Sequence, residues 1–114
     1  MTIQSTATEP VNGIAAPGVL VDLIAREVYV DVEPVRLTRR EFDLLLHLVR
    51  HPGVAFNRVQ LLRAVWGHEF SGERTVDVHI RRLRVKIGPY SAHITTLHGW
   101  GYRLEPGRPF SIHG

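Results

Sequence analysis

The residues of this chain best suited to chemistry are basic side chains concentrated between positions 74 and 86. Five of these thirteen residues are Arg or Lys and one, Asp77, is acidic, which leaves a net charge of +4. Apolar residues recur in the same segment at the spacing of one face of a 3.6-residue helix. They are Val76, Ile80, Leu83 and Ile87. The spacing predicts a helix over residues 74–87 that buries this face and points arginines away from it.

The opposite face of that helix has the residue types that read DNA. At about 100° per residue, this face carries Arg74, Thr75, Val78, Arg81, Arg82 and Val85. The major groove is about 12 Å wide, accepts one helix and is read most often by arginine, while an apolar side chain can contact a thymine methyl group. A helix that only faced water would favour Glu, Lys or Gln at the two valine positions. A solvated basic surface is the alternative, because runs of charge usually face water.

Charge is divided unevenly along the whole chain. Of the 114 residues, the first 35 contain five acids and one Arg, a net charge of −4, whereas residues 36–114 carry +7. This asymmetry indicates a polyanion as the partner of the later part. The length fits one domain with its own hydrophobic core. The absence of Cys excludes disulfides, thiol catalysis and Cys-based zinc sites.

Sequence features of an enzyme are missing. The chain has no Gly-rich phosphate loop and no G-x-S-x-G motif, and its acids are scattered. His47 and His51 have an i, i+4 spacing that can hold a metal, but no third ligand or intervening Glu accompanies them. We therefore expect a solvent-facing histidine pair, no catalysis, no metal and no cofactor. No apolar run approaches the roughly 18 residues of a membrane span and no signal peptide is visible, which favours the cytoplasm.

The segments before the basic helix must position it. Residues 1–17 have no periodicity and read as a flexible tail or linker. Segments 19–23, 27–32 and 35–37 are rich in β-branched residues, with a turn at residues 33–34, and predict a small antiparallel sheet.

Two capping signals predict two further helices. Thr38 and Glu41 make a capping box for a helix that ends before residues 52–53, Pro-Gly. Asn57 begins a similar signal for a shorter helix that ends at Gly67.

A β-hairpin is expected after the basic helix, which ends at residues 88–89. Its strands are residues 94–97 and 102–105, joined by a turn over residues 98–101. Residues 106–114 read as a frayed C-terminal tail. The fold class is therefore α+β, with an N-terminal antiparallel sheet, three helices and a C-terminal hairpin, in the order of a winged helix-turn-helix.

Several motifs in this order resemble one family closely. They are Leu37-Thr38-x-x-Glu41-Phe42-x-Leu44-Leu45, Leu61-Leu62-x-x-Val65-Trp66-Gly67, Arg74-Thr75-Val76-Asp77-Val78-His79-Ile80-x-Arg82-Leu83-Arg84 and Gly99-x-Gly101-Tyr102-Arg103. Over residues 18–105 the chain resembles the OmpR/PhoB type of winged-helix domain, the DNA-binding effector domain of two-component response regulators. The receiver domain that usually precedes it is not in the sequence. The chain is thus expected to be the effector part of such a regulator or a stand-alone relative.

The resemblance implies double-stranded DNA as partner, with residues 74–87 in the major groove and the hairpin, or wing, near the minor groove. It also implies head-to-tail pairs on direct repeats and a loop, residues 67–73, that can face RNA polymerase. The resemblance implies, position by position, that the following residues contact DNA: Arg74, Thr75, Val78, His79, Arg81, Arg82, Arg84, Thr96 and His98. At the position of His98 the family often has Arg, and a mostly neutral imidazole makes a weaker minor-groove contact.

Individual roles follow from residue type. We expect Arg82 and Thr75 to contact base edges or adjacent phosphates, and Val78 to contact a thymine methyl group. Phosphate neighbours are expected to be Arg74, Arg84 and Lys86. Arg81 has an alternative partner in Asp77, four residues earlier. Trp100, in the wing turn, is expected either along a sugar-phosphate edge or packed back on the wing.

The function expected is sequence-specific DNA binding by a transcriptional regulator of the bacterial cytoplasm, associated with the nucleoid. The alternative is a winged helix used for protein contacts, with DNA binding lost or subordinate. Three arginines among residues 74, 78, 81 and 82 argue against that alternative. RNA fits less well, because a helix cannot read the deep, narrow A-form major groove.

Overall fold

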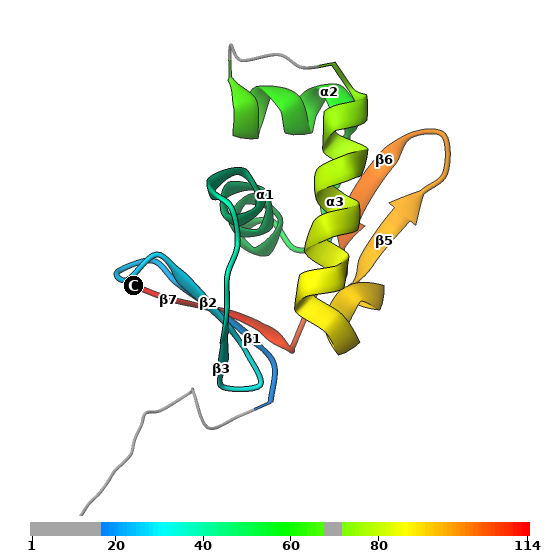
Figure 1. The fold of residues 1–114 in the computed structure, drawn as a ribbon. Coiled ribbons are helices and arrows are strands. Elements are labelled where there is room, and N and C mark those ends of the chain that lie inside the picture. Colours follow the sequence, from blue (N-terminus) through cyan, green and yellow to red (C-terminus); the bar gives the residue numbers. More distant parts are fainter. Residues whose placement is uncertain (1–16, 68–71) are drawn as a thin grey trace, which may run out of the picture. The chain divides into compact units, whose positions relative to one another are not determined.

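The computed structural model describes residues 17–67 and 72–114, which fall into two compact units (Figure 1). The first unit comprises the chain up to Arg36 together with Arg108–Gly114, and the second runs from Leu37 to Gly107. Within the described ranges, no helix is both long and apolar enough to cross a membrane.

The first unit is a four-stranded sheet in the order β3-β2-β1-β7. Its strands are β1 (Val19–Asp22), β2 (Glu27–Val30), β3 (Glu33–Val35) and β7 (Phe110–His113). The β1–β2 and β2–β3 pairs are antiparallel, as predicted, and β7 pairs parallel to β1. The sheet is therefore mixed.

Strand β7 corrects the prediction that residues 106–114 form a frayed tail. Phe110 lies opposite Val19 and His113 opposite Asp22, and backbone bonds at both ends of β1 complete the pairing. The segment Phe110–His113 alternates apolar and polar residues, but four residues carry little local signal. The partner strand lies some ninety residues earlier in the sequence. Pairing at that separation is decided by the tertiary structure.

The β2–β3 turn also differs from the prediction. It lies at Asp31 and Val32, not at residues 33–34, because Val30 pairs directly with Glu33. Both turn residues have positive φ, 50° and 66°, as a two-residue hairpin of the I′ type requires. Pro34 is instead part of β3, an edge strand where its missing N–H breaks no ladder bond.

The second unit contains the three helices and a three-stranded sheet in the order β4-β6-β5. In chain order its elements are α1 (Arg39–Arg50), β4 (Ala55–Asn57), α2 (Arg58–Leu61), η2 (Leu62–Trp66), α3 (Arg74–Ile87), η3 (Gly88–His93), β5 (Ile94–Leu97) and β6 (Gly101–Leu104). Figure 1 shows α1 nearly end-on, α3 upright and the β5–β6 hairpin alongside it. The helices and the hairpin were predicted, whereas β4 and η3 were not.

Both capping signals act as predicted. The Thr38 hydroxyl accepts from the Glu41 N–H while Glu41 accepts from the Thr38 N–H, and Asn57 and Gln60 form the same reciprocal pair. The second helix has one α-helical turn followed by the π-helical turn η2, and it ends at Gly67, where φ is 62°. These caps fix where α1 and α2 begin.

The core of the second unit is built from the apolar faces of its helices and the inner face of the hairpin. α1 contacts α3, η2 and β6. α1, α2, α3, β5 and β6 each contribute fully buried side chains. These are Leu44, Leu45, Leu48, Leu61, Ile80, Leu83, Ile87, Ile94 and Leu104. One edge of α3 is thereby anchored in the core along its whole length.

Candidate nucleic-acid interface

The two faces of α3 are divided as the sequence predicted. Val76, Ile80, Leu83 and Ile87 are at most 1% exposed. The opposite side of the helix presents the outward stripe, which we define as Arg74, Val78, Arg81, Arg82 and Val85, and all five are exposed. Val78 is 42% exposed and Val85 is 77% exposed. Apolar surface in contact with water is unfavourable in free energy, and contact with an apolar group of a ligand would remove that cost.

The arginines of the outward stripe are available for a ligand. Within the described part of the chain, Arg74, Arg81 and Arg82 form no hydrogen bond or ion pair. The alternative partner considered for Arg81 is therefore corrected, because the Asp77 carboxylate is bound by Arg58 and Tyr102. At about 100° per residue, Asp77 lies on the flank of the helix, beside the stripe, and the charge of Arg74 helps to lower its pKa.

One flank of α3 is tied down by Lys86 and His79. The Lys86 ammonium lies 2.6 Å from Glu41 Oε1 on α1, and the Glu41 side chain is 1% exposed. His79 Nδ1 lies 2.7 Å from the Thr75 carbonyl oxygen, and its ring stands edge-on to Trp66, with centroids 4.9 Å apart. Lys86 was expected beside a phosphate, and in the structure its ammonium already pairs with a buried carboxylate.

The Glu41 carboxylate is held in its ionised form. Burial raises its pKa, but hydrogen bonds from Lys86 and from the Thr38 N–H outweigh that effect, so its pKa lies below the ordinary value. A single carboxylate thus closes the capping box of α1 and binds the last turn of α3.

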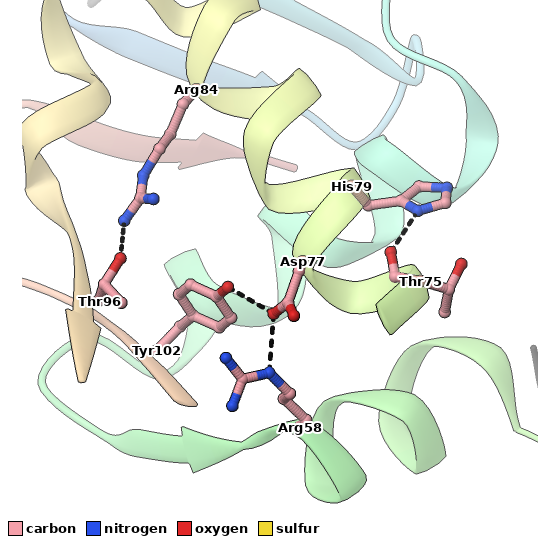
Figure 2. Close-up of polar contacts among 7 residues, drawn as sticks. All are labelled: Arg58, Thr75, Asp77, His79, Arg84, Thr96 and Tyr102. Carbon is pink, nitrogen blue, oxygen red and sulfur yellow. Dashed lines mark hydrogen bonds and ion pairs between the residues drawn. The ribbon is translucent and has the colours of Figure 1, made fainter. Parts of the chain in front are cut away.

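The other flank of α3 is tied to the wing and to the start of α2 (Figure 2). Asp77 Oδ1 accepts from the Tyr102 hydroxyl at 2.6 Å and from Arg58 Nε at 2.8 Å. Two turns further along α3, Arg84 Nη2 donates to the Thr96 hydroxyl at 2.8 Å. Arg84 also donates to the carbonyl of Ile94, the first residue of β5.

The Tyr102 ring lies between two guanidinium groups. The Cζ atoms of Arg58 and Arg84 are each 5.7 Å from its centroid, within cation–π range. Burial raises the pKa of Asp77, but the bonds from Tyr102 and Arg58 outweigh it and hold that pKa below its ordinary value. Burial and the bond to Asp77 raise the pKa of Tyr102. We name Asp77, Arg58 and Tyr102 the Asp77 node.

The wing presents its turn to solvent. His98 and Trp100 are exposed, Trp100 by 46%, and the Trp100 N–H donates to the Leu97 carbonyl at 2.8 Å to close the turn. Thr96 is half-buried and holds Arg84, so the two wing-turn residues are the more accessible. Thr75, at the first turn of α3, is also half-buried.

Sequence reasoning missed Arg58 and gave Asp77, Tyr102 and Glu41 no part in positioning α3. The capping pattern placed Arg58 at the first position of α2, and periodicity placed Asp77 between the two faces of α3. Neither signal connects the two positions, which are 19 residues apart. Residues 68–71, most of the loop expected to face RNA polymerase, lie outside the described residues.

The histidine pair of α1 does not simply face solvent as predicted. The rings of His47 and His51 are 4.6 Å apart, and both pack against Phe56 of β4. His47 Nε2 is buried without a hydrogen-bond partner, and the pKa of His47 is lowered by burial and by the neighbouring His51 and Arg50. The described residues contain no group of three His, Asp or Glu side chains that could hold a metal ion.

The fold and the exposed basic helix define a class of protein. A three-helix unit with a solvent-facing, arginine-rich third helix and an adjoining β-hairpin is a winged-helix DNA-binding domain. The chain belongs to the family described as transcriptional regulatory protein, C terminal, whose model matches residues 32–104. This is the OmpR/PhoB type that the motifs indicated.

Individual relatives agree with this assignment. The transcriptional regulatory protein YclJ of Bacillus subtilis is 51% identical over 83 residues, which cover 70% of this chain and 37% of YclJ. The crystal structure of the DNA-binding domain of Bacillus subtilis CssR superposes with a TM-score of 0.68 at 40% identity, covering 76% of this chain and 99% of that domain. The Klebsiella pneumoniae RstA DNA-binding domain, solved in complex with the RstA box, superposes with a TM-score of 0.66 at 34% identity. The match covers 76% of this chain and 90% of that chain.

Proposed function

We propose that this chain binds double-stranded DNA in a sequence-specific manner and places a transcriptional regulator on its target site. The observation that carries the proposal is the outward stripe of α3, which has three arginines without an ion-pair partner among the described residues, two exposed valines and no carboxylate. From Arg74 to Val85 the stripe runs eleven residues, about 16 Å at 1.5 Å per residue. That length matches about five base-pair steps of 3.4 Å.

Roles within the stripe follow from chemistry and position. Arg82 is proposed to donate to a guanine edge, Val78 to contact a thymine methyl group, and Arg81 and Arg74 to contact base edges or phosphates. Thr75 adds a hydroxyl at the first turn of α3. Lys86, Arg84 and His79 are left out of the proposed direct contacts, because each side chain already has a partner within the domain. These partners are Glu41, Thr96 and the Thr75 carbonyl.

The wing completes the proposed interface. His98 and Trp100 are proposed to lie near the minor groove beside the α3 site, His98 as a weak polar contact and Trp100 along a sugar-phosphate edge. RstA, solved in complex with the RstA box, supports duplex DNA as the ligand. The proposed regulator acts without catalysis or cofactor in the bacterial cytoplasm, on the nucleoid. We further propose head-to-tail pairs on direct repeats and contact between loop 67–73 and RNA polymerase.

Selection of bound sequences from a random duplex pool tests the function directly. We expect enrichment of one motif, repeated about one helical turn apart if two copies bind together. Failure to enrich any sequence, with binding to protein partners intact, would support the alternative of a protein-contact module.

Arg82→Ala then tests the assigned role on the selected duplex. Affinity is expected to fall by about 1–3 kcal/mol for the selected sequence and much less for a scrambled one. Arg39→Ala is the matched control, because Arg39 is exposed on α1 and the substitution changes the net charge equally. An equal loss on both duplexes would reassign Arg82 to a phosphate contact.

A further inference from the structure

The Asp77 node joins three elements that contribute differently to the interface. Asp77 comes from α3, Tyr102 from β6 of the wing, and Arg58 from the start of α2, directly after β4. A single carboxylate oxygen, Asp77 Oδ1, receives both hydrogen bonds, at 2.6 Å and 2.8 Å (Figure 2). Because Tyr102 also pairs with Phe56 of β4, a shift of α3 would strain both bonds and both strands.

A second tie between α3 and the wing lies two turns away. Arg84 bonds Thr96 and the Ile94 carbonyl on β5. Asp77 and Arg84 are seven residues apart, about 10.5 Å along the helix. The Asp77–Tyr102 bond reaches β6 and the Arg84–Thr96 bond reaches β5. Two attachments at this separation fix the angle between α3 and the wing, whereas a single attachment would leave α3 free to pivot.

We propose that Asp77 is a positioning residue for DNA binding, which acts through Tyr102 and Arg58 to hold α3 and the wing at the angle where both meet one duplex. This inference rests on the proposed function. Asp77 itself touches no DNA in this scheme, since its carboxylate is used by the node. A binding site loses affinity when the residues that support it are removed, because the side chains that contact the ligand are no longer held in the required geometry, even though all of them are still present.

The sign of the effect separates positioning from simple electrostatics. Asp77 is a negative charge on the helix that approaches a polyanion. On charge alone, Asp77→Asn removes repulsion and tightens binding. Positioning gives the opposite result, a loss of about tenfold or more, the size of one good contact.

Glu73→Gln is the matched control for charge. Glu73 precedes the first residue of α3, is exposed and makes no side-chain capping bond, and its neutralisation changes the net charge by the same amount. Tyr102→Phe supplies a second, charge-free variant. It removes the hydroxyl that donates to Asp77 but keeps the ring between the two guanidinium groups.

The experiment measures the affinity of the full chain for its selected duplex, together with hydroxyl-radical protection of that duplex. Each variant is first shown by circular dichroism to be folded at the assay temperature. We expect Asp77→Asn and Tyr102→Phe each to weaken binding about tenfold, the double variant to be no weaker than the worse single one, and Glu73→Gln to bind as tightly as the parent or more tightly. Protection by the wing should disappear while protection in the major groove persists.

Three results would overturn the positioning role. Asp77→Asn could bind as tightly as Glu73→Gln, Tyr102→Phe could bind like the parent, or all protected positions could weaken equally. If the parent chain selects no duplex at all, the proposed function fails instead, and that result is distinct from the other three.

Discussion

Replacing Lys86 by Met separates the two roles that a cation on α3 can have. From the sequence, Lys86 is expected beside a DNA phosphate. In the structure, Lys86 Nζ lies 2.6 Å from Glu41 Oε1. Methionine keeps most of the length of the side chain and removes the ammonium group, with its charge and its hydrogen-bond donors. The variant is therefore expected to lose stability and to keep its affinity for DNA.

The magnitude follows from what Glu41 loses. Removing one partner of a fully buried ion pair costs about 3–5 kcal/mol, and a hydrogen bond to a charged group contributes about 1.5–3 kcal/mol. Glu41 is 1% exposed, but the Lys86 side chain is 33% exposed, so water screens part of the pair. Glu41 also keeps the bond from the Thr38 N–H. We expect a loss of about 2 kcal/mol, or roughly 6–10 °C in Tm for a domain of this size.

The loss should depend on pH in a defined direction. The pKa of Glu41 is lowered in the folded parent. The stability that the ionised pair contributes is therefore present above the unfolded-state pKa, about 4.3, and is lost as the pH falls through the lower folded-state pKa. The difference in stability between the parent and Lys86→Met should be full at pH 7 and should shrink below about pH 4.

Arg81→Met is the matched control, because it removes one positive charge from an exposed position on the same helix. It should leave Tm nearly unchanged and weaken DNA binding. The assays are thermal unfolding by circular dichroism and duplex titration at 0.15 M ionic strength, where long-range effects of net charge are screened beyond about 8 Å. An unchanged Tm for Lys86→Met with a tenfold loss of affinity would refute the inward role of Lys86.

Two further predictions concern the packing around β4. The pKa of His47 is lowered chiefly by burial, so the imidazole binds a proton more readily in the unfolded chain than in the folded one. The free energy of unfolding should therefore fall as the pH drops through about 6.5 and level off below the folded-state pKa. His47→Gln should flatten this dependence on pH in denaturant titrations between pH 5 and pH 8. Gly101→Ala should destabilise by about 1–3 kcal/mol, because its Cβ would lie 2.0 Å from the Phe56 carbonyl oxygen across the β4–β6 pair. An unchanged unfolding midpoint for Gly101→Ala would show that β4 can move away at little cost.

The features that the sequence predicted correctly depend on neighbours close in the chain. The capping box of Thr38 and Glu41 spans three residues, and the buried face of α3 repeats within each turn. Such patterns are properties of one element, so they can be read without knowing what lies beside it. The hairpin turn belongs to the same group, with Gly99 at φ 73°. It covers residues 98–100, one residue fewer than predicted, because Gly101 already pairs with Leu97.

The features that could not be predicted depend on distant partners. Lys86 and Glu41 are 45 residues apart, Tyr102 and Asp77 are 25 apart, and β7 pairs with a strand at the other end of the chain. Periodicity distinguishes the buried face of α3 from the outward one, but it gives no partner for a charge on the flank between them. The first two β-branched segments form strands as predicted. The third strand is Glu33–Val35 and not residues 35–37, because Pro34 resembles a turn residue but lies in an edge strand.

The flanks of α3 change how its charge should be counted. The segment from Arg74 to Lys86 has five cations, but Lys86 neutralises Glu41 and Arg84 is bonded to the wing. Asp77, the one acid, is in turn matched by Arg58. The charge that faces a ligand is therefore that of Arg74, Arg81 and Arg82. At roughly −0.9 per phosphate, the slope of log affinity against log salt should be about −2 for this helix if Arg82 contacts a guanine, and about −3 if it contacts a phosphate. The flank charges of Asp77 and Arg84 are used instead to tie α3 to the wing, since three arginines can read a duplex only if the helix that carries them keeps its orientation.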